Sequence, residues 1–401
     1  MLYFIKDKKN CTGCTACYSA CPKNCIEMIR DVRGFLYPEA NGDICTNCGM
    51  CEKVCPILKN GRVENSLIEQ EAVAAIIKDM EKWKLSTSGG AFECICEAMS
   101  KRRNKVVVYG AVFDGLYVKH VGAVYPDIQK MYKSKYVQSD MEGCFREIRE
   151  KLKNGENVIF SGTPCQNAGL KSFLLKEYDN LFCIDFICHG VGSPKVFDNY
   201  IKERELKKKK KISEYIFRYK LKRFGDYKRY ISKIIYEDRS YEYEEMDEYN
   251  NLFLNQLCLR DCCGETCKFR NQKRWSDITI ADFNNFRGIF PDIYDSRGYS
   301  SVIVNTEKGK QIFEMLVDNM NLYRCRIEDI KKENPLFCRT TAENPKRDEF
   351  FEDYINGMTI SCLNKKYVSG EKRPLKYYIA DNTPYLAKYV LRKIKKLLKN
   401  H

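Results

Sequence analysis

The stretch CTGCTACYSACP at residues 11–22 decides the first part of the fold, because a near copy, CTNCGMCEKVCP, follows at residues 45–56. Both copies read C-x2-C-x2-C-x3-C-P. With 22 cysteines in 401 residues, four cysteines at one fixed spacing arise by chance at roughly 1 in 100,000 starting positions, so a repeat of the spacing indicates metal ligation.

This spacing suits a pair of [4Fe–4S] clusters. Three thiolates on a short irregular loop bind three irons of one cubane, and the fourth cysteine, placed before a proline, reaches across to the other cluster. Zinc sites normally use pairs of CxxC rather than triplets. We therefore expect a dicluster ferredoxin domain over residues 1–60 with two ligand sets: Cys11, Cys14, Cys17 and Cys55 at one cluster, and Cys45, Cys48, Cys51 and Cys21 at the other. Cys25 falls outside the repeat and is expected to be a small buried residue.

The composition places this domain in a larger globular protein. Hydrophobic residues make up 44% of the chain and charged residues 31%, a balance typical of proteins with a real core. The sequence has no apolar stretch long enough to span a membrane, and it lacks the pattern of a signal peptide. We expect a cytoplasmic location, where so many thiols favour metal binding or catalysis over disulfides.

The net charge of +15 indicates only that a binding partner is negatively charged. Basic surfaces attract nucleic acids, anionic lipids, and acidic cofactors or proteins alike. We interpret the five lysines at 207–211 as solvated, and the segment 215–238 as an ordinary basic hairpin, with nucleic-acid binding as the weaker alternative. Residues 384–401 predict a basic amphipathic helix that either packs on its own domain or docks on an anionic membrane or a partner. Its apolar face carries Leu386, Tyr389, Val390, Ile394, Leu397 and Leu398.

Beyond residue 70, apolar segments alternate with helical ones. Strands are expected at 72–79, at 105–114 and at the beginnings of 157–170 and 180–194, and a helix is expected at about 141–153. The predicted fold class is therefore α+β and α/β: the small ferredoxin domain is followed by a mixed α/β domain. Ligands of such sheets bind at the carboxyl ends of strands, where the loops SGTPCQ (161–166) and CHG (188–190) are expected.

Three further features carry functional hypotheses. The turn STSGG, residues 86–90, offers hydroxyl groups and backbone N–H groups to a phosphate, but this is weak evidence by itself and a plain N-capped helix is the favoured explanation. Cys165 and Cys188 follow predicted strands, so they are either small buried residues or thiols facing a ligand. A further thiol group, whose spacing fits no standard metal motif, contains Cys258, Cys262, Cys263 and Cys267.

Taken together, STSGG, SKYVQS (134–139), SGTPCQ, DFICHGVGSP (185–194), and SDITIADF (276–283) followed by SSVIVNTEKG (300–309) resemble the coenzyme F420 hydrogenase/dehydrogenase beta-subunit family. The resemblance covers roughly residues 3–320. It divides the body into an N-terminal part at 61–155 and a C-terminal part with the flavin and substrate site at 156–325. It leaves 326–401 as an uncharacterised helical tail that ends in the basic helix.

The resemblance implies an FAD-binding flavoprotein with iron–sulfur clusters. It assigns flavin contacts to Ser86, Thr87, Ser88, Gly89, Gly90, Ser134, Lys135, Tyr136, Gln138, Ser161, Gly162, Thr163, Pro164, Cys165 and Gln166. Cys188 and His189 are implied to line the same site and are the candidate catalytic residues, with His189 as the proton donor and a structural role as its alternative. The chain departs from the family at LRDCCGETC, where a CxxC is usual, and at 281–284, where Ala-Asp-Phe-Asn replaces Gly-Asp-Phe-Trp. A third cluster at Cys258–Cys267 therefore stays open.

These expectations combine into one leading hypothesis. An FAD-dependent iron–sulfur oxidoreductase would receive electrons from a one-electron donor such as ferredoxin and pass them through two [4Fe–4S] clusters and FAD to a small molecule or to coenzyme F420. One alternative is an electron-input beta subunit of a larger hydrogenase or dehydrogenase. The other is an iron–sulfur nucleic-acid-binding or sensor protein, which leaves the SGTPCQ and CHG loops unexplained.

Overall fold

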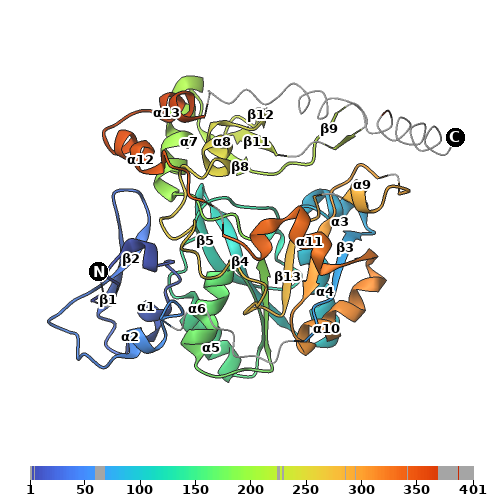
Figure 1. Ribbon diagram of the computed structural model, residues 1–401, viewed down its shortest axis with the longest axis horizontal. Helices are drawn as coiled ribbons and strands as arrows, with labels where there is room; N and C mark the ends of the chain where they lie inside the picture. The colour runs from blue at the N-terminus through green and yellow to red at the C-terminus, as the bar shows by residue number, and fades with distance from the viewer. Residues whose placement is uncertain are drawn as a thin grey trace.

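The computed structural model describes residues 2–3, 5–58, 68–223, 226–227, 230–284, 286–293, 295–340, 342–368 and 387. Figure 1 shows three parts: an N-terminal cysteine-rich module, a body built on one large sheet, and a cap of helices and a small sheet along one side of the body. Within the described ranges, no helix has both the length and the apolar character needed to cross a membrane.

The N-terminal module consists of short elements joined by irregular loops. Strands β1 (Ile26–Arg30) and β2 (Leu36–Ala40) form an antiparallel pair. The turn between them depends on Asp31, whose carboxylate accepts a hydrogen bond from the Phe35 backbone N–H at 2.9 Å, and on Gly34 at φ +95°. The other elements are η1 (Lys8–Asn10), α1 (Ala16–Ala20) and α2 (Met50–Lys53).

Eight strands form the main sheet in the order β15-β3-β14-β13-β7-β6-β4-β5. The four central strands, β13, β7, β6 and β4, run parallel, and the flanking strands pair antiparallel. The strands are β3 (Ala72–Ile77), β4 (Val106–Asp114), β5 (Tyr117–Val124), β6 (Asn157–Ser161), β7 (Leu181–Phe186), β13 (Ile278–Asp282), β14 (Ser300–Val304) and β15 (Met320–Cys325). Residues 61–155 and 156–325 therefore contribute strands to one common sheet.

Each face of the sheet carries its own core. Along β4, Val106 and Val108 pack into one core, whereas Val107 and Tyr109 pack into the other, because successive side chains of a strand point to opposite faces. The first core is covered by α3 (Met80–Leu85), α4 (Ala91–Arg102) and α10 (Glu307–Phe313), and the second by α5 (Cys144–Lys153) and α6 (Pro164–Leu174). The predicted fold class, a small α+β module before a mixed α/β body, is confirmed.

The cap has a three-stranded antiparallel sheet with the order β12-β11-β8. Its elements are α7 (Pro194–Lys208), β8 (Ile212–Ile216), β11 (Ile231–Tyr236), β12 (Tyr241–Glu245), α8 (Glu248–Leu254), α12 (Arg347–Ile355) and α13 (Ile360–Tyr367). An aromatic core joins them and extends to Phe35 of the module, whose ring meets that of Phe351 at 6.4 Å. Lysines of the 207–211 run form surface ion pairs: Lys208 with Glu242, Lys210 with Asp238 and Lys211 with Glu205.

The part of 326–401 that the structure describes packs onto the rest of the chain, since α12 and α13 belong to the cap. The basic pattern at 384–401 lies outside the described residues, apart from residue 387. The remaining short elements are η2 (Gln129–Met131), β9 (Lys222–Arg223), β10 (Asp226–Tyr227), α9 (Phe286–Ile289), η3 (Glu314–Asp318), α11 (Ile327–Glu333) and η4 (Pro335–Phe337).

The module is fastened to the body at α1. Arg146 on α5 donates to the backbone carbonyls of Tyr18 and Ser19, at 2.8 and 2.9 Å. The Arg146 guanidinium also lies over the Tyr18 ring, 5.2 Å from its centroid. This contact holds the first cysteine run next to α6 (Figure 1).

Candidate functional site

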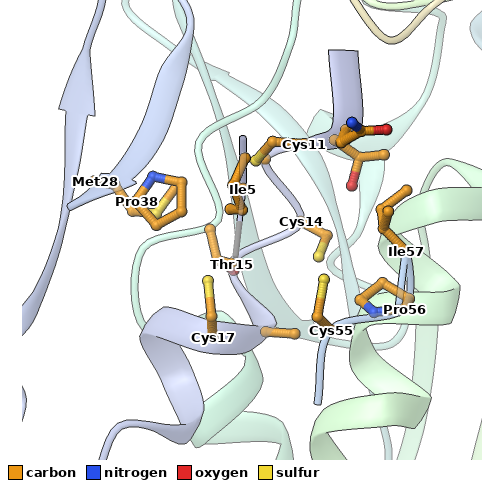
Figure 2. Close-up of a pocket in the computed structure, with 14 residues that line it drawn as sticks. Ile5, Cys11, Cys14, Thr15, Cys17, Met28, Pro38, Cys55, Pro56 and Ile57 are labelled. Atoms are coloured by element: carbon orange, nitrogen blue, oxygen red, sulfur yellow. The ribbon is translucent and has the colours of Figure 1, made fainter. Parts of the chain in front are cut away.

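The first ligand set lines one pocket of the module (Figure 2). Cys11, Cys14, Cys17 and Cys55 surround about 360 Å³ of space free of atoms, part of it open to solvent. The loop between η1 and α1 turns inward at Gly13 and Thr15, both in the left-handed region of φ. Cys55 enters from the other repeat, just before Pro56, and the apolar wall is completed by Ile5, Met28, Pro38 and Ile57.

The residues of this pocket fit a [4Fe–4S] cluster. Burial raises the pKa of the Cys14 thiol to about 12 and raises that of Cys17 as well, so both need a cation beside them to become thiolates. Among the described residues no three potential ligands come close enough to hold a single metal ion, and the cysteines instead line a cavity. The buried hydroxyl group of Thr15 has no hydrogen-bond partner in the described part of the chain, and a cluster sulfur would supply an acceptor.

The second ligand set lies closer to solvent. Cys48 is exposed, whereas Cys45 and Cys51 are half-buried and Cys21 is buried. The Sγ atoms of Cys21 and Cys25 lie 3.4 Å apart, so a second buried thiol stands beside this ligand. The exposed Cys48 leaves this end of the module open to solvent.

A third group of thiols forms where the sequence analysis had assigned separate roles. Burial raises the pKa of Cys165, and the thiols of Cys188, Cys263 and Cys267 raise it further. Burial likewise raises the pKa of Cys188 to about 12, followed by the effect of the Cys263 thiol. A Cβ atom added to Gly190 would lie 3.1 Å from Cys263 Cβ, so the CHG loop touches the 258–267 loop. Cys258 lies apart from this group, beside Tyr249.

The third group adjoins the first ligand set. Cys55, Cys165 and Cys267 all pack against the same small apolar cluster, which contains Ile57, Ala168 and Phe269. Helix α6 forms a shared wall: Cys165 is in its first turn, and Gly169 packs against Cys14 so tightly that an added Cβ would lie 2.9 Å from the Cys14 sulfur. Four residues of helix rise by about 6 Å, so one turn of α6 separates the two groups of thiols.

Sequence reasoning did not foresee this gathering. The signal it contained was the position of SGTPCQ and CHG after two strands, and β6 and β7 are indeed parallel neighbours whose carboxyl ends meet. No local sequence pattern predicts that the 258–267 loop lies beside these two loops. This placement follows from the antiparallel bridge between Gly192 and Leu259 and from the hydrogen bond of the Arg260 N–H to the Val191 carbonyl, at 3.0 Å.

His189 is held by backbone. Its Nε2 donates to the Phe253 carbonyl at 3.2 Å, and its ring packs on the Phe253 ring at 5.1 Å. Burial lowers the pKa of His189, so the ring is neutral near pH 7. These contacts favour the structural alternative for His189 over the role of proton donor.

The STSGG turn connects α3 to α4. Gly89 has no space for a side chain, because a Cβ would overlap the Ala75 carbonyl oxygen of β3. Gly90, at φ +84°, precedes α4, and no side chain caps this end of the helix. Ser86 donates to the Lys82 carbonyl at 2.8 Å, while the buried Thr87 hydroxyl has no partner in the described part of the chain.

Two cations of the 215–238 segment lie over this turn, which sequence reasoning missed. Lys220 donates to the carbonyls of Trp83 and Ser88, the latter at 2.8 Å, and its ammonium lies 3.7 Å from the centroid of the Trp83 ring. Arg218 forms an ion pair with Asp282, at the end of β13, and Asp282 also accepts from the Ser88 hydroxyl. Burial, then the charges of Lys133 and Arg218, lower the pKa of Lys220 to about 6.

The SKYVQS segment runs between these loops. Lys135 donates to the carbonyls of residues 130, 132 and 133, and burial lowers its pKa to about 7. Tyr136 stacks on Phe253 at 4.8 Å, and Ser134 is half-buried. The Gln138 side chain forms hydrogen bonds within the protein: its amide donates to the Thr12 carbonyl of the module at 3.2 Å and accepts from Arg260.

The SGTPCQ loop starts α6 through a reciprocal cap. Thr163 Oγ1 accepts from the Gln166 N–H, and Gln166 Oε1 accepts from the Thr163 N–H. Pro164 occupies the first turn, and Gly162, after Ser161, has no room for a Cβ beside the Phe160 ring. Gln166 also donates to Ser139, which joins this loop to SKYVQS.

The residues around STSGG fit an anionic cofactor such as a dinucleotide. They combine an uncapped helix start, a Thr87 hydroxyl with no partner among the described residues, and Lys220, whose hydrogen bonds to those residues go to uncharged carbonyls. The twelve-residue α4 is long enough for its dipole to favour a negative charge there. These residues would hold the pyrophosphate side of FAD.

Comparisons with known proteins agree with this organisation. Residues 155–330 match the family model for the C terminus of the coenzyme F420 hydrogenase/dehydrogenase beta subunit, and residues 10–57 match the 4Fe-4S dicluster domain. Over 333 residues the chain is 23% identical to a component of the F420H2 dehydrogenase of Methanosarcina mazei, and the match covers 78% of this chain and 84% of that protein.

Two weaker likenesses accompany these matches. An uncharacterised ferredoxin of Methanocaldococcus jannaschii is 36% identical over 52 residues, 13% of this chain and 66% of the ferredoxin. A chain of the F420-reducing [NiFe] hydrogenase complex from Methanosarcina barkeri superposes with a TM-score of 0.42 and 15% identity, covering 77% of this chain and 94% of that one. The dicluster match makes the N-terminal module an iron–sulfur, electron-transfer domain.

Proposed function

The chain belongs to the coenzyme F420 hydrogenase/dehydrogenase beta-subunit family, and from that premise we propose that it is an iron–sulfur flavoenzyme. It takes electrons from a one-electron donor such as ferredoxin and passes them to a small molecule or to a deazaflavin such as coenzyme F420. FAD, when bound, exchanges single electrons with the clusters and a hydride with the substrate.

The observation that carries this proposal is the series of thiol groups from the surface of the module to the loops that follow β6 and β7. The exposed set with Cys48 comes first, and the pocket with Cys14 lies next to α6. Cys165 follows one turn away on the same helix, together with Cys188 and two cysteines of the 258–267 loop. We propose a third [4Fe–4S] cluster on Cys165, Cys188, Cys263 and Cys267, which places Cys165 and Cys188 in ligation rather than in flavin contact or proton transfer.

The chain's own residues then have separate tasks. The apolar wall of the first pocket keeps water from the cluster there. Lys220, Thr87 and the start of α4 bind and orient the anionic part of FAD. The Tyr136 ring stacks on Phe253 of α8 and so joins the SKYVQS segment to the cap.

The same electron path would serve an electron-input subunit of a larger complex. The relative from Methanosarcina mazei is named as a subunit of a dehydrogenase, and the match spans most of its length. Co-purification of a tagged chain with a large redox subunit from the native host would favour this second candidate over a stand-alone enzyme.

The test is anaerobic purification followed by iron, sulfide and FAD counts. Two clusters give about eight irons per chain and three give about twelve, and we expect about twelve with one FAD. Changing Cys188 to Ala should lower the count by about four. The matched control is Cys325→Ala, a half-buried thiol on the edge strand β15, and it should keep the full count.

Each failure would have its own meaning. A count of about eight irons that Cys188→Ala leaves unchanged would remove the third cluster only. A protein that holds its iron but binds no FAD after reconstitution would overturn the flavoenzyme proposal.

A further inference from the structure

Arg260 is fully buried at the junction of the module and the body. It lies in the loop before Cys262, and its side chain reaches into the module. The guanidinium Nε donates to the Cys11 carbonyl at 2.9 Å, and Nη2 donates to the Leu36 carbonyl at 2.9 Å. Nη1 donates to Gln138 Oε1 at 3.0 Å. Arg260 thus joins three segments that are far apart in sequence.

The same guanidinium contacts a proposed iron ligand. Nη2 lies 3.7 Å from Cys11 Sγ, within the range of a hydrogen bond to sulfur. The chain makes room for this approach at Gly13, where an added Cβ would lie 3.0 Å from Arg260 Cζ. The Tyr37 ring covers the other side of the guanidinium, with 4.1 Å between the ring centroid and Cζ.

The charge of Arg260 has no carboxylate counterpart in the described part of the chain. All the ion pairs found there involve other cations, and the adjacent Asp261 is paired with Arg33 at 2.8 Å. The potentially anionic groups that act most strongly on the Arg260 guanidinium are Tyr37 and the thiols of Cys11, Cys262 and Cys263. Burying a guanidinium without a counter-ion is strongly unfavourable, so an anionic group is needed where those thiols lie.

We infer that Arg260 is the buried counter-cation of the cluster held by Cys11, Cys14, Cys17 and Cys55, and that it raises the reduction potential of that cluster. This inference rests on the proposed function, because it requires the cluster. A cluster with four thiolate ligands is anionic and becomes more negative on reduction, so a fixed positive charge favours the reduced form. The N–H···S hydrogen bond acts in the same direction.

The alternative is that Arg260 only fastens the module to the body. Its hydrogen bonds to carbonyls would then explain its burial, and its loss would reduce stability without changing any potential. A lysine distinguishes the two roles, because it keeps the positive charge but lacks the planar fork that contacts Cys11, Gln138 and Leu36 together. The potential of the cluster is therefore the decisive readout.

The experiment is a redox titration of the full-length, anaerobically purified protein, followed by electron paramagnetic resonance. In Arg260→Gln we expect the midpoint potential of one cluster to become more negative, by an amount equal to about a tenfold loss in its reduction equilibrium, the lower end for a charge-assisted hydrogen bond. The iron count should stay at the wild-type value. Arg260→Lys should shift the same signal by less.

The matched control is Arg274→Gln. Arg274 is also fully buried, but its contacts are with the body: its guanidinium lies 3.7 Å from Asp185 and donates a hydrogen bond to the Phe337 carbonyl. This change should reduce stability and leave every cluster potential unchanged. If Arg274→Gln does not fold, Arg274→Lys serves as the same control.

Three outcomes would overturn the inference. The first is that Arg260→Gln keeps its iron and all wild-type potentials. The second is an equal shift in Arg274→Gln. The third is loss of the cluster's iron in Arg260→Lys, since the retained charge would then be no substitute for the contacts. If Cys11→Ala retained the full iron count, the proposed ligand set would fail instead, independently of Arg260.

Discussion

Lys220 lies beside the proposed FAD-binding turn, a position that its neighbours in the sequence do not predict. In the sequence it is one of many basic residues in an aromatic, strand-like segment. In the structure it lies against the ring of Trp83 and over the STSGG turn, and its nearest charges are mostly cations. A buried lysine in such surroundings loses its proton readily and regains it when an anion binds.

This gives a pH prediction for Lys220. Its pKa falls from 10.5 to about 6 in the folded chain, so between these values the unfolded chain binds more protons and stability increases with pH. Lys220→Met should reduce this slope, although overall stability falls because the Trp83 and Ser88 carbonyls lose a donor. Urea unfolding of the FAD-free protein between pH 6.5 and 9 measures the slope of the unfolding free energy against pH.

The exposed Lys222→Met is the control for this change and should keep the wild-type slope. Lys220→Met should also weaken FAD binding, whereas Lys222→Met should not. An unchanged slope together with unchanged FAD affinity would remove Lys220 from the binding surface.

At the scale of elements, helix α6 is the wall on which two groups of thiols meet. Its first turn carries Cys165 and is fixed by the reciprocal cap of Thr163 and Gln166. One turn later, Gly169 allows Cys14 to approach the helix backbone. A helix interior normally disfavours glycine by about 1 kcal/mol relative to alanine, so the close approach explains its presence.

We predict that Gly169→Ala separates folding from cluster binding. Alanine improves the helix propensity of α6, but its Cβ would lie 2.8 Å from Cys14 Cβ and push that ligand away. The variant should fold and lose up to about four irons, as measured by iron analysis and circular dichroism. Gly143→Ala, where a Cβ meets nothing within 4 Å, is the control. A Gly169→Ala protein with wild-type iron and spectra would contradict the shared-wall argument.

At the scale of the whole molecule, the net charge of +15 attracts negatively charged partners before they make contact. Residues 1–58 carry nearly balanced charges, so most of the positive excess lies on the body, the cap and the tail. Such a charge steers an acidic partner toward the molecule and raises the association rate more than the final affinity. The exposed Cys48 end of the module is where we expect the electron to enter.

Reduction by an acidic ferredoxin should therefore slow several-fold when the salt concentration is raised from low to about 0.5 M, since salt screens charges over distances of about 10 Å or less. Stopped-flow absorbance of the clusters measures this rate. Reduction by the methyl viologen radical cation is the control and should not slow. A ferredoxin rate that is independent of salt would exclude electrostatic steering.

The sequence predicted the features that depend on residues close together along the chain. The two ligand runs are set by the spacing of cysteines within a few residues, and the strands β3, β4, β6 and β7 are short, continuous apolar segments whose length favours strands over helices. The fold class and the family resemblance follow from these segments in order. The contacts assigned to STSGG, SKYVQS and SGTPCQ remain predictions, with Gln138 and Gln166 occupied by hydrogen bonds within the chain.

Only the tertiary structure decided which cysteines form the third thiol group. Cys165, Cys188 and Cys263 come from three segments separated by about twenty to seventy-five residues, and their meeting depends on the order of parallel strands and on the path of a distant loop. Arg260 and Lys220 reach their places in the same way. A spacing motif records distances along the chain, whereas the burial of a charge beside a thiol depends on distances across it, which are set when the sheet, the cap and the module pack together.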